Sequence, residues 1–292
     1  SIIYAASSKD DPFSEKTWKK CNPNYGVSLL KSNMEEYANE ARTKPTYYNT
    51  FLRLQLNVWT STEQQFIPPK VWDKCNLQPL NLEFFHGKKC TMAFDLSSVS
   101  DFTAVSIATK DEKEIYHTLP FFFIPEEKMQ HRNMRAQIEA WVREGHVTAI
   151  PGKVVDYQFV YNKVNEISKI CTITEISYDK WNANMLSTQL TNEGANMFVF
   201  RQGYVTMSPA TKQFETLVIE KKINHGGNPV LAWMNSNMAV TQDAAGNIKP
   251  DKSKSSEKID GMITTLMAIS RLIEAPAAQG PSVYEERGLL SV

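Results

Sequence analysis

The stretch Lys89-Cys-Thr-Met-Ala-Phe-Asp95 begins the part of the chain that determines the fold. Its polar and apolar side chains alternate with a period of two, which predicts a β-strand. Two further strands are predicted at short intervals, over residues 102–109 and 114–124. Because the connections between the three strands are short, we expect them to form an antiparallel meander.

Helices and strands alternate after the meander. Apolar residues recur with helical spacing over 126–144 and over 156–170. Strands are predicted over 173–178 and 197–200, with a helix over 182–193 between them. This order describes a mixed five-stranded sheet flanked by helices, which is an α/β fold.

The C-terminal third adds helices and a hairpin to this sheet. A helix is predicted from residue 208 to 222, and Asp243-Ala-Ala-Gly-Asn247 is typical of a hairpin turn. The last helix is predicted over 257–273, where apolar residues form one stripe. The sequence beyond Ala275 is rich in Ala, Pro, Gly and Ser, which predicts a flexible tail.

The residues before the sheet form a separate part of the chain. Helices are predicted over 32–42 and 47–59, and the following stretch contains three prolines and no clear periodicity. The first residue is Ser1 rather than Met, so we expect the chain to be cut from within a longer protein. The predicted organisation is a small, mostly helical segment (1–60), a linker (61–88), the sheet domain (89–275) and the tail (276–292).

Composition excludes several classes of protein. The 292 residues are 42% hydrophobic and 11% aromatic, enough for a large core, which excludes disorder as the main state. The longest apolar run, Leu119-Pro-Phe-Phe-Phe-Ile124, is far shorter than the roughly 20 residues that span a bilayer, so we expect no membrane span. With 32 basic and 32 acidic residues, the chain is not expected to coat nucleic acid by bulk charge.

Motif searches leave carboxylates as the candidate chemistry. The sequence contains neither the phosphate-binding Gly-x-x-x-x-Gly-Lys-Ser/Thr loop nor the dinucleotide-binding Gly-x-Gly-x-x-Gly pattern. The Gly-x-Ser-x-Gly motif of serine hydrolases is also absent. The four cysteines form no Cys-x-x-Cys pair and are expected to be reduced and mostly buried, as in a cytosolic protein.

Three aspartates occupy related positions in the predicted fold. Asp95 ends the first strand, Asp179 follows the fourth strand, and Asp260 lies in the first turns of the last helix. Three carboxylates brought together would repel one another unless a cation neutralised them, and Mg²⁺ or Mn²⁺ prefers such oxygen ligands. Two such ions about 4 Å apart can stabilise the attacking and leaving oxygens in phosphodiester cleavage.

Simpler interpretations exist for each acidic residue. An aspartate after a strand often forms a turn, and one near a helix N-terminus is favoured by the helix dipole. Nearby, Asp101 is better explained by turn formation, and Glu175 and Glu257 by solvation. Spacing alone therefore leaves both the metal site and the structural interpretation open.

Seven motifs, in order, resemble one known family. They are Trp18 with Asn22-Pro-Asn-Tyr-Gly26; Phe51-Leu-Arg-Leu-Gln-Leu-Asn-Val-Trp59; Ala93-Phe-Asp-Leu-Ser97 with Asp101-Phe-Thr-Ala104; Tyr178-Asp-Lys-Trp181; Gln202-Gly203 with Met207-Ser-Pro209; His225-Gly-Gly-Asn-Pro229; and Lys258-Ile-Asp-Gly261. With these motifs, nearly the whole chain resembles the C-terminal part of the large subunit of terminases, which package DNA in tailed bacteriophages.

The resemblance implies a fold and a catalytic site. The family joins an ATP-driven DNA translocase to a nuclease of the RNase H-like fold. Residues 1–60 would then be the end of the ATPase domain, and ATP hydrolysis is not expected because the phosphate-binding loop has no match here. The family's acidic triad falls on Asp95, Asp179 and Asp260 as catalytic and metal-binding residues. Asp95 is expected to bridge two Mg²⁺ or Mn²⁺ ions, with Asp179 and Asp260 each completing one.

The resemblance also implies a function and partners. The expected activity is an endonuclease that cuts concatemeric double-stranded viral DNA by two-metal hydrolysis, with Lys180, Lys212 and Lys258 as candidate phosphate contacts. Expected partners are the small terminase subunit and the portal protein, in the host cytoplasm at the procapsid. The chain would be oligomeric in the packaging motor, with a monomer as one option for the isolated fragment, and it is not expected to be a structural protein of the virion.

Two alternatives remain open. In the first, the chain is a docking module that binds portal or neighbouring subunits, and its nuclease is silent in isolation. In the second, it is a resolvase or transposase of the same fold, although the terminase-like segments before residue 87 argue against that.

Overall fold

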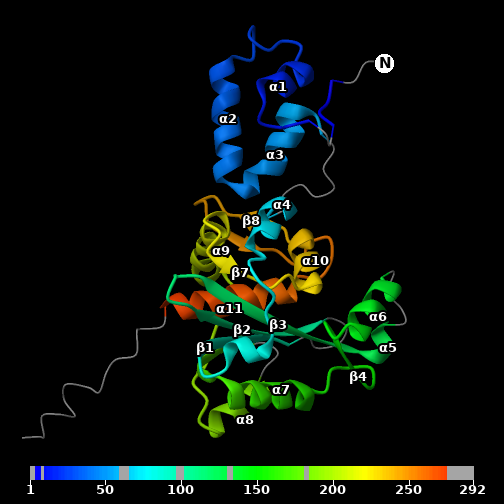
Figure 1. The fold of residues 1–292 in the computed structure, drawn as a ribbon, viewed down its shortest axis with the longest axis vertical. Helices are drawn as coiled ribbons and strands as arrows, with labels where there is room; N and C mark the ends of the chain where they lie inside the picture. The colour runs from blue at the N-terminus through cyan, green and yellow to red at the C-terminus, as the bar shows by residue number, and fades with distance from the viewer. Residues whose placement is uncertain are drawn as a thin grey trace, which may run out of the picture.

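The chain forms a small helical unit at one end and a larger sheet domain at the other (Figure 1). This computed structural model describes 4–7, 10–58, 66–96, 102–129, 134–180 and 184–274 of the 292 residues. The predicted tail and Asp101 lie outside the described residues. All four cysteines are described, and all are free, buried thiols, as predicted.

The sheet is built on a central strand with a meander on one side and parallel strands on the other. Strands β1 (Lys89–Asp95), β2 (Thr103–Lys110) and β3 (Tyr116–Pro125) form the predicted antiparallel meander. β5 (Thr172–Tyr178) pairs in parallel with β1, and β6 (Met197–Val199) pairs in parallel with β5. The order β3-β2-β1-β5-β6 contains all five predicted strands.

Two short strands extend the sheet beyond the five predicted. β4 (Thr148–Ile150) and β7 (Ile223–Asn224) both pair in parallel with β3, so the sheet has seven strands. A strand of two or three residues is too short to show an alternating pattern, so the sequence did not predict either. The order and directions of the five main strands are those expected of an RNase H-like fold, and the predicted fold class is confirmed.

Helices between the strands agree with most of the predicted ranges. The helix predicted over 126–144 is two helices, α5 (Glu126–Met129) and α6 (Arg135–Arg143). α7 (Tyr157–Ile170) begins after Asp156, whose carboxylate accepts a 2.9 Å hydrogen bond from the Gln158 backbone N–H and caps the helix. α8 (Asn184–Asn192) follows β5.

Three helices and a hairpin complete the sheet domain. α9 (Tyr204–Ile219) begins four residues before the predicted start and contains Pro209 within the helix. α10 (Pro229–Asn237) was not predicted to be helical. β8 (Val240–Gln242) and β9 (Ile248–Pro250) form the predicted hairpin, and α11 (Asp260–Glu274) is the last helix.

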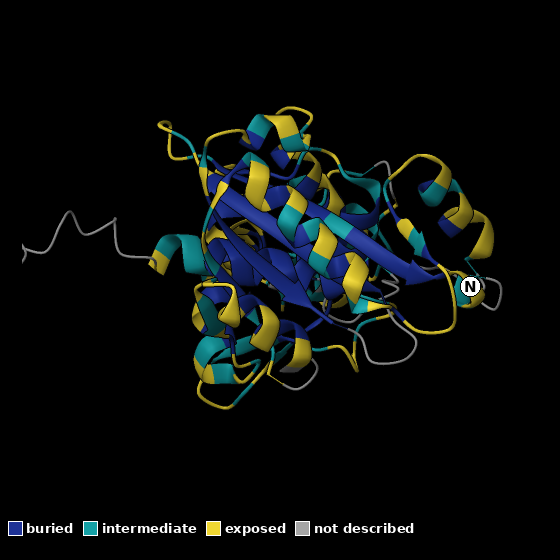
Figure 2. Ribbon diagram, turned by 90° about the horizontal axis from the view of Figure 1, so that it is seen from below, coloured by how far each residue is buried: buried dark blue, intermediate teal, exposed yellow. Residues whose placement is uncertain are grey.

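The two faces of the sheet are covered by different helices. α9, α10 and α11 lie on one face with the larger core, and α7 and α8 lie on the other with a second core. Viewed from the α7 side, Figure 2 shows buried strands behind helices with exposed outer surfaces. Residues 260–270 of α11 are buried without interruption, which makes α11 the most enclosed helix of the described chain.

The helical unit has a core of its own. It consists of α1 (Glu15–Cys21), α2 (Lys31–Thr43) and α3 (Pro45–Leu56), and their apolar side chains form a separate cluster. The described part of the segment predicted as a linker contains α4 (Pro69–Trp72) and two short 3₁₀ helices, η1 (Asp73–Cys75) and η2 (Leu82–Phe85). Its apolar side chains pack into the two cores of the sheet domain. The division into domains stays a prediction.

Candidate metal centre

Two of the three predicted aspartates face the same cation. Asp95 is the last residue of β1 and Asp260 is the first residue of α11; both are buried, at 6% and 4% exposed. The ammonium Nζ of Lys252 lies 2.7 Å from Oδ2 of Asp95 and 2.7 Å from Oδ1 of Asp260. The end of the central strand and the start of the last helix therefore present carboxylate oxygens to one position.

Hydrogen bonds between α11 and the sheet fix this arrangement. The Thr91 hydroxyl of β1 donates to the Ala268 carbonyl at 2.7 Å, and Ser106 of β2 shares a 2.7 Å hydrogen bond with Thr264. Each bond joins a strand residue to a side of α11 that is completely buried. Since buried polar groups are costly unless paired, these contacts favour a single position of the helix on the sheet.

Asp179 lies at the same edge of the sheet. It follows β5 directly, and the parallel register that pairs Phe94 with Tyr178 continues toward Asp95 and Asp179. Its negative charge contributes to raising the pKa of Asp95, so the two carboxylates interact. However, no three Asp, Glu, His or Cys side chains within the described ranges form a group ready to hold a metal ion. Asp179 is therefore near Asp95 and Asp260, but the three carboxylates do not form a ready set of metal ligands.

Burial and neighbouring charges set the protonation of this site. Burial raises the pKa of Asp95, and the charge of Asp179 adds to this increase, while Lys252 and the Gln202 amide oppose it. Burial also opposes the charge of Lys252, but attraction to Asp95 and Asp260 outweighs this, and the pKa of Lys252 is raised. The lysine is therefore a stable cation between the two carboxylates.

Lys252 was not among the residues singled out from the sequence. It lies in the segment 251–259 that connects β9 to α11, and 157 positions separate it from Asp95. Its sequence surroundings are a polar stretch without periodicity, so no local pattern connects it to the aspartates. The contact becomes visible only in the folded structure, where α11 packs against β1.

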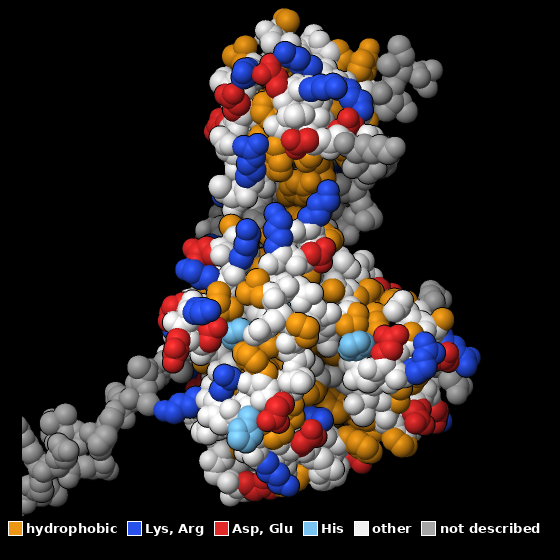
Figure 3. Space-filling model, in the orientation of Figure 1, with side chains coloured by type: hydrophobic (Ala, Val, Ile, Leu, Met, Phe, Trp, Pro, Cys, Tyr) orange, Lys and Arg blue, Asp and Glu red, His pale blue; other side chains and the backbone are white. Residues whose placement is uncertain are grey.

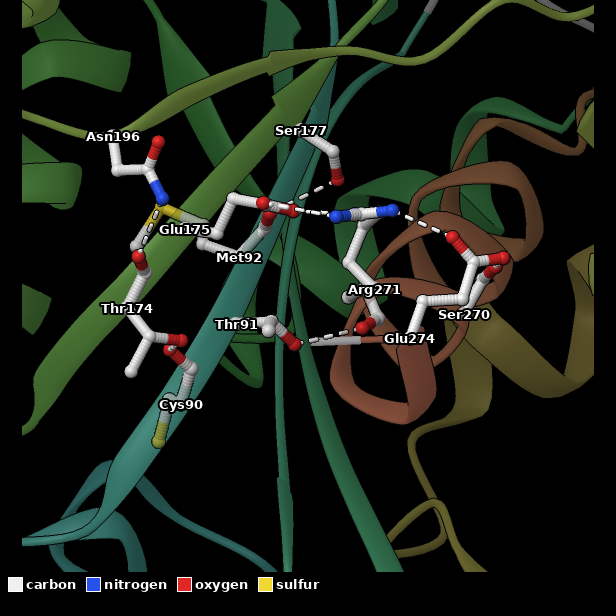
Figure 4. A network of polar contacts seen from close by, with 11 residues as sticks. Cys90, Thr91, Met92, Thr174, Glu175, Ser177, Asn196, Ser270, Arg271 and Glu274 are labelled. Atoms are coloured by element: carbon white, nitrogen blue, oxygen red, sulfur yellow. Dashed lines mark hydrogen bonds and ion pairs between the residues drawn. The ribbon is translucent and has the colours of Figure 1, made fainter. Parts of the chain in front are cut away.

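The other acidic candidates lie apart from this pair. The prediction that Glu175 is solvated is wrong. Its carboxylate accepts two hydrogen bonds from the guanidinium of Arg271, and the Nη2–Oε2 distance is 3.0 Å. Figure 4 shows this ion pair, which links β5 to the C-terminal end of α11, with Glu274 on the other side of Arg271. The Arg271 guanidinium also lies 3.7 Å from the ring centroid of Phe198. Glu257 is exposed, as predicted.

The chemistry of the aspartates fits a hard divalent cation. Asp95 and Asp260 already place oxygen atoms around one positive charge, with the carboxylate of Asp179 and the amide of Gln202 acting on the same site. Mg²⁺ and Mn²⁺ prefer such all-oxygen ligands, whereas nitrogen and sulfur ligands favour zinc. The Lys252 ammonium shows that a cation is accommodated at this position.

The fold and this acidic edge define an RNase H-like domain, and comparison with known proteins identifies its family. The family described as the terminase large subunit, endonuclease domain, matches residues 1–275. The chain is 33% identical over 271 residues to the terminase large subunit of Enterobacteria phage HK97, covering 91% of this chain and 53% of that protein. It is 29% identical over 303 residues to Protein YmfN of Escherichia coli K12, covering 99% of this chain and 64% of that protein.

A solved structure gives the same result. The crystal structure of the HK97 bacteriophage large terminase superposes with a TM-score of 0.64 and 32% sequence identity, over 91% of this chain and 56% of that chain. The chain therefore belongs to the family of terminase large subunit nuclease domains. It spans between half and two thirds of the length of the two curated relatives. None of the described helices has both the length and the apolar character needed to cross a membrane.

Proposed function

We propose that this chain is a metal-dependent DNA endonuclease that cuts concatemeric double-stranded DNA during the packaging of a viral genome. The observation that carries this proposal is the convergence of two buried aspartates on one cation, at the edge of the sheet in a terminase nuclease domain. The alternative function, a docking module with a silent nuclease, is tested by the same cleavage experiment.

In this proposal, Asp95, Asp179 and Asp260 would hold two Mg²⁺ or Mn²⁺ ions. When bound, such ions lower the pKa of a water molecule and stabilise charge on the phosphate. Because Asp95 and Asp260 are buried, their negative charges are costly without a nearby cation, and binding a cation relieves that cost. The rigid attachment of α11 to β1 keeps Asp260 in register with Asp95.

The surface charge is consistent with weak binding of DNA by this chain alone. Basic and acidic side chains are interspersed on the face shown in Figure 3, as expected for zero net charge. Lys180 and Lys212 are exposed and Lys258 is half-buried, so phosphate contacts by all three remain a proposal. We propose that the small terminase subunit and the portal bring the chain to DNA in the host cytoplasm, within an oligomeric motor. This chain is not proposed to hydrolyse ATP.

Cleavage of plasmid DNA in the presence of Mn²⁺ tests the proposal. Asp95→Asn and Asp260→Asn should each abolish cleavage because each removes a charged metal ligand while preserving side-chain size. Glu257→Gln is the matched control: it neutralises an exposed carboxylate three residues before Asp260 and should retain full activity. Full activity of a folded Asp95→Asn variant would refute the proposed site, and no cleavage by the unmodified chain with any divalent ion would favour the docking module.

A further inference from the structure

Lys252 has a place in this site that the proposed nuclease mechanism does not explain. Its ammonium contacts one oxygen of each buried aspartate, both at 2.7 Å, which is the short distance typical of charged hydrogen bonds. A divalent metal that bound the same two oxygens would lie about 2.0–2.1 Å from them. Two cations cannot occupy that space together, so the lysine and the metal exclude each other at these oxygens.

The side chain of Lys252 can leave without disturbing the core. It is 48% exposed, whereas the side chains of Asp95 and Asp260 are only 8% and 5% exposed. Lys252 therefore approaches the carboxylates from the solvent side. Moving the ammonium outward would break ion pairs and leave the apolar cores unchanged.

The backbone that carries Lys252 is held in place independently. The Asp251 carboxylate accepts a 2.9 Å hydrogen bond from the Ser253 N–H, and the Ser255 hydroxyl donates to the Asp251 carbonyl at 2.7 Å. The Asp251 N–H and the Ser255 hydroxyl also connect this segment to Ala239, next to β8. The lysine is thus presented by a fixed loop, and only its side chain needs to move.

We propose that Lys252 is a built-in counterion that competes with the divalent metal for Asp95 and Asp260 and thereby sets the metal concentration at which the site is loaded. The proposal rests on the proposed nuclease function and adds a positioning residue to it. Without metal, the ammonium compensates the buried carboxylates and stabilises the fold. Metal loading transfers that role from the lysine to the ion.

Titration of Mn²⁺ into the full chain at pH 8, followed by calorimetry, tests this competition. Lys252→Met keeps an unbranched side chain and removes the charge. It should bind Mn²⁺ at least about tenfold more tightly, because no charged hydrogen bonds need to be broken first. Lys252→Arg keeps the positive charge and should bind Mn²⁺ like the unmodified chain. The matched control is Lys254→Met, on the same segment, whose Nζ lies 3.2 Å from the Thr241 hydroxyl and contacts neither aspartate; its affinity should be unchanged.

A second measurement separates the proposed competition from a purely structural role. The melting temperature of metal-free Lys252→Met should fall below that of the unmodified chain, and Mn²⁺ should raise it more than it raises that of the unmodified chain. Equal or weaker Mn²⁺ affinity in folded Lys252→Met overturns the inference. If that happens while Asp95→Asn still abolishes Mn²⁺ binding, the proposed metal site stands and only the role of Lys252 fails. If the unmodified chain binds no Mn²⁺, the proposed function fails as well.

Discussion

Replacement of Gly261 by alanine tests how closely the start of α11 must approach the sheet. Gly261 directly follows Asp260. Its backbone N–H donates a hydrogen bond to Sδ of Met234, with an N–S distance of 3.1 Å. A Cβ atom at this position would overlap the ring of Phe122 and lie 3.0 Å from the same sulfur. Since both neighbours are completely or almost completely buried, neither side chain has free space into which it can move.

The expected cost follows from two opposing effects. Inserting a methyl group into a well-packed core costs about 1–3 kcal/mol. Alanine is better than glycine in a helix by roughly 0.5–1 kcal/mol, which offsets part of that cost. We therefore expect Gly261→Ala to lower the free energy of unfolding by about 1–2 kcal/mol, with overpacking as the larger effect. Because α11 must shift to relieve the overlap, Asp260 should also move away from Asp95, and DNA cleavage should fall.

Urea unfolding followed by circular dichroism measures the change. Gly203→Ala controls for the added methyl group, because a Cβ there has no heavy atom within 4 Å; its cost, about 0.5–1 kcal/mol for alanine at the N-cap of α9, should not respond to Phe122→Leu. Phe122→Leu should reduce the cost of Gly261→Ala when the two are combined, because the smaller side chain leaves room for the methyl group. Unchanged stability of Gly261→Ala, or strictly additive effects in the double variant, would refute the argument.

Two further substitutions test contacts away from the aspartates. Glu175→Gln should destabilise the chain by about 1–3 kcal/mol, because the Arg271 guanidinium loses its charged partner, while cleavage should persist because this pair lies at the opposite end of α11 from Asp260. Thermal unfolding checks the first part, and a loss of stability no larger than that of exposed Glu257→Gln would contradict it. Asp156→Ala should cost about 1 kcal/mol by removing the cap of α7. Urea unfolding measures this change as well. An Asp156→Asn variant that loses as much stability as the alanine variant would argue against capping.

The five main strands of the sheet could be predicted from the sequence because most of them are long enough to be recognised from local sequence patterns. The predicted bounds of strand β1, residues 89–95, agree with the structure, although both faces of the strand are buried and not one face alone. β4 and β7 contain only two or three residues, and their pairing with β3 depends on contacts that no local pattern records. The predicted start of α9 at residue 208 is four residues too late, and the structure accommodates Pro209 inside the helix, where proline is usually unfavourable.

The site could be predicted only in part, for a related reason. Asp95 and Asp260 stand at the ends of predicted elements, so a common location followed from the fold, and the structure brings them to one cation. Glu175 was interpreted as solvated because the sequence does not reveal that Arg271 lies opposite it. Lys252 was missed because its contacts arise only when the segment 251–259 folds back over the end of β1. The role of Asp179 stays a prediction.

The most direct measurement of the central claim is anomalous diffraction from crystals of this chain soaked in Mn²⁺. The proposal predicts anomalous density in contact with the carboxylates of Asp95, Asp179 and Asp260, with the Lys252 ammonium displaced from between Asp95 and Asp260. Soaked crystals that show no density beside these aspartates, with Lys252 still bridging Asp95 and Asp260, would contradict it.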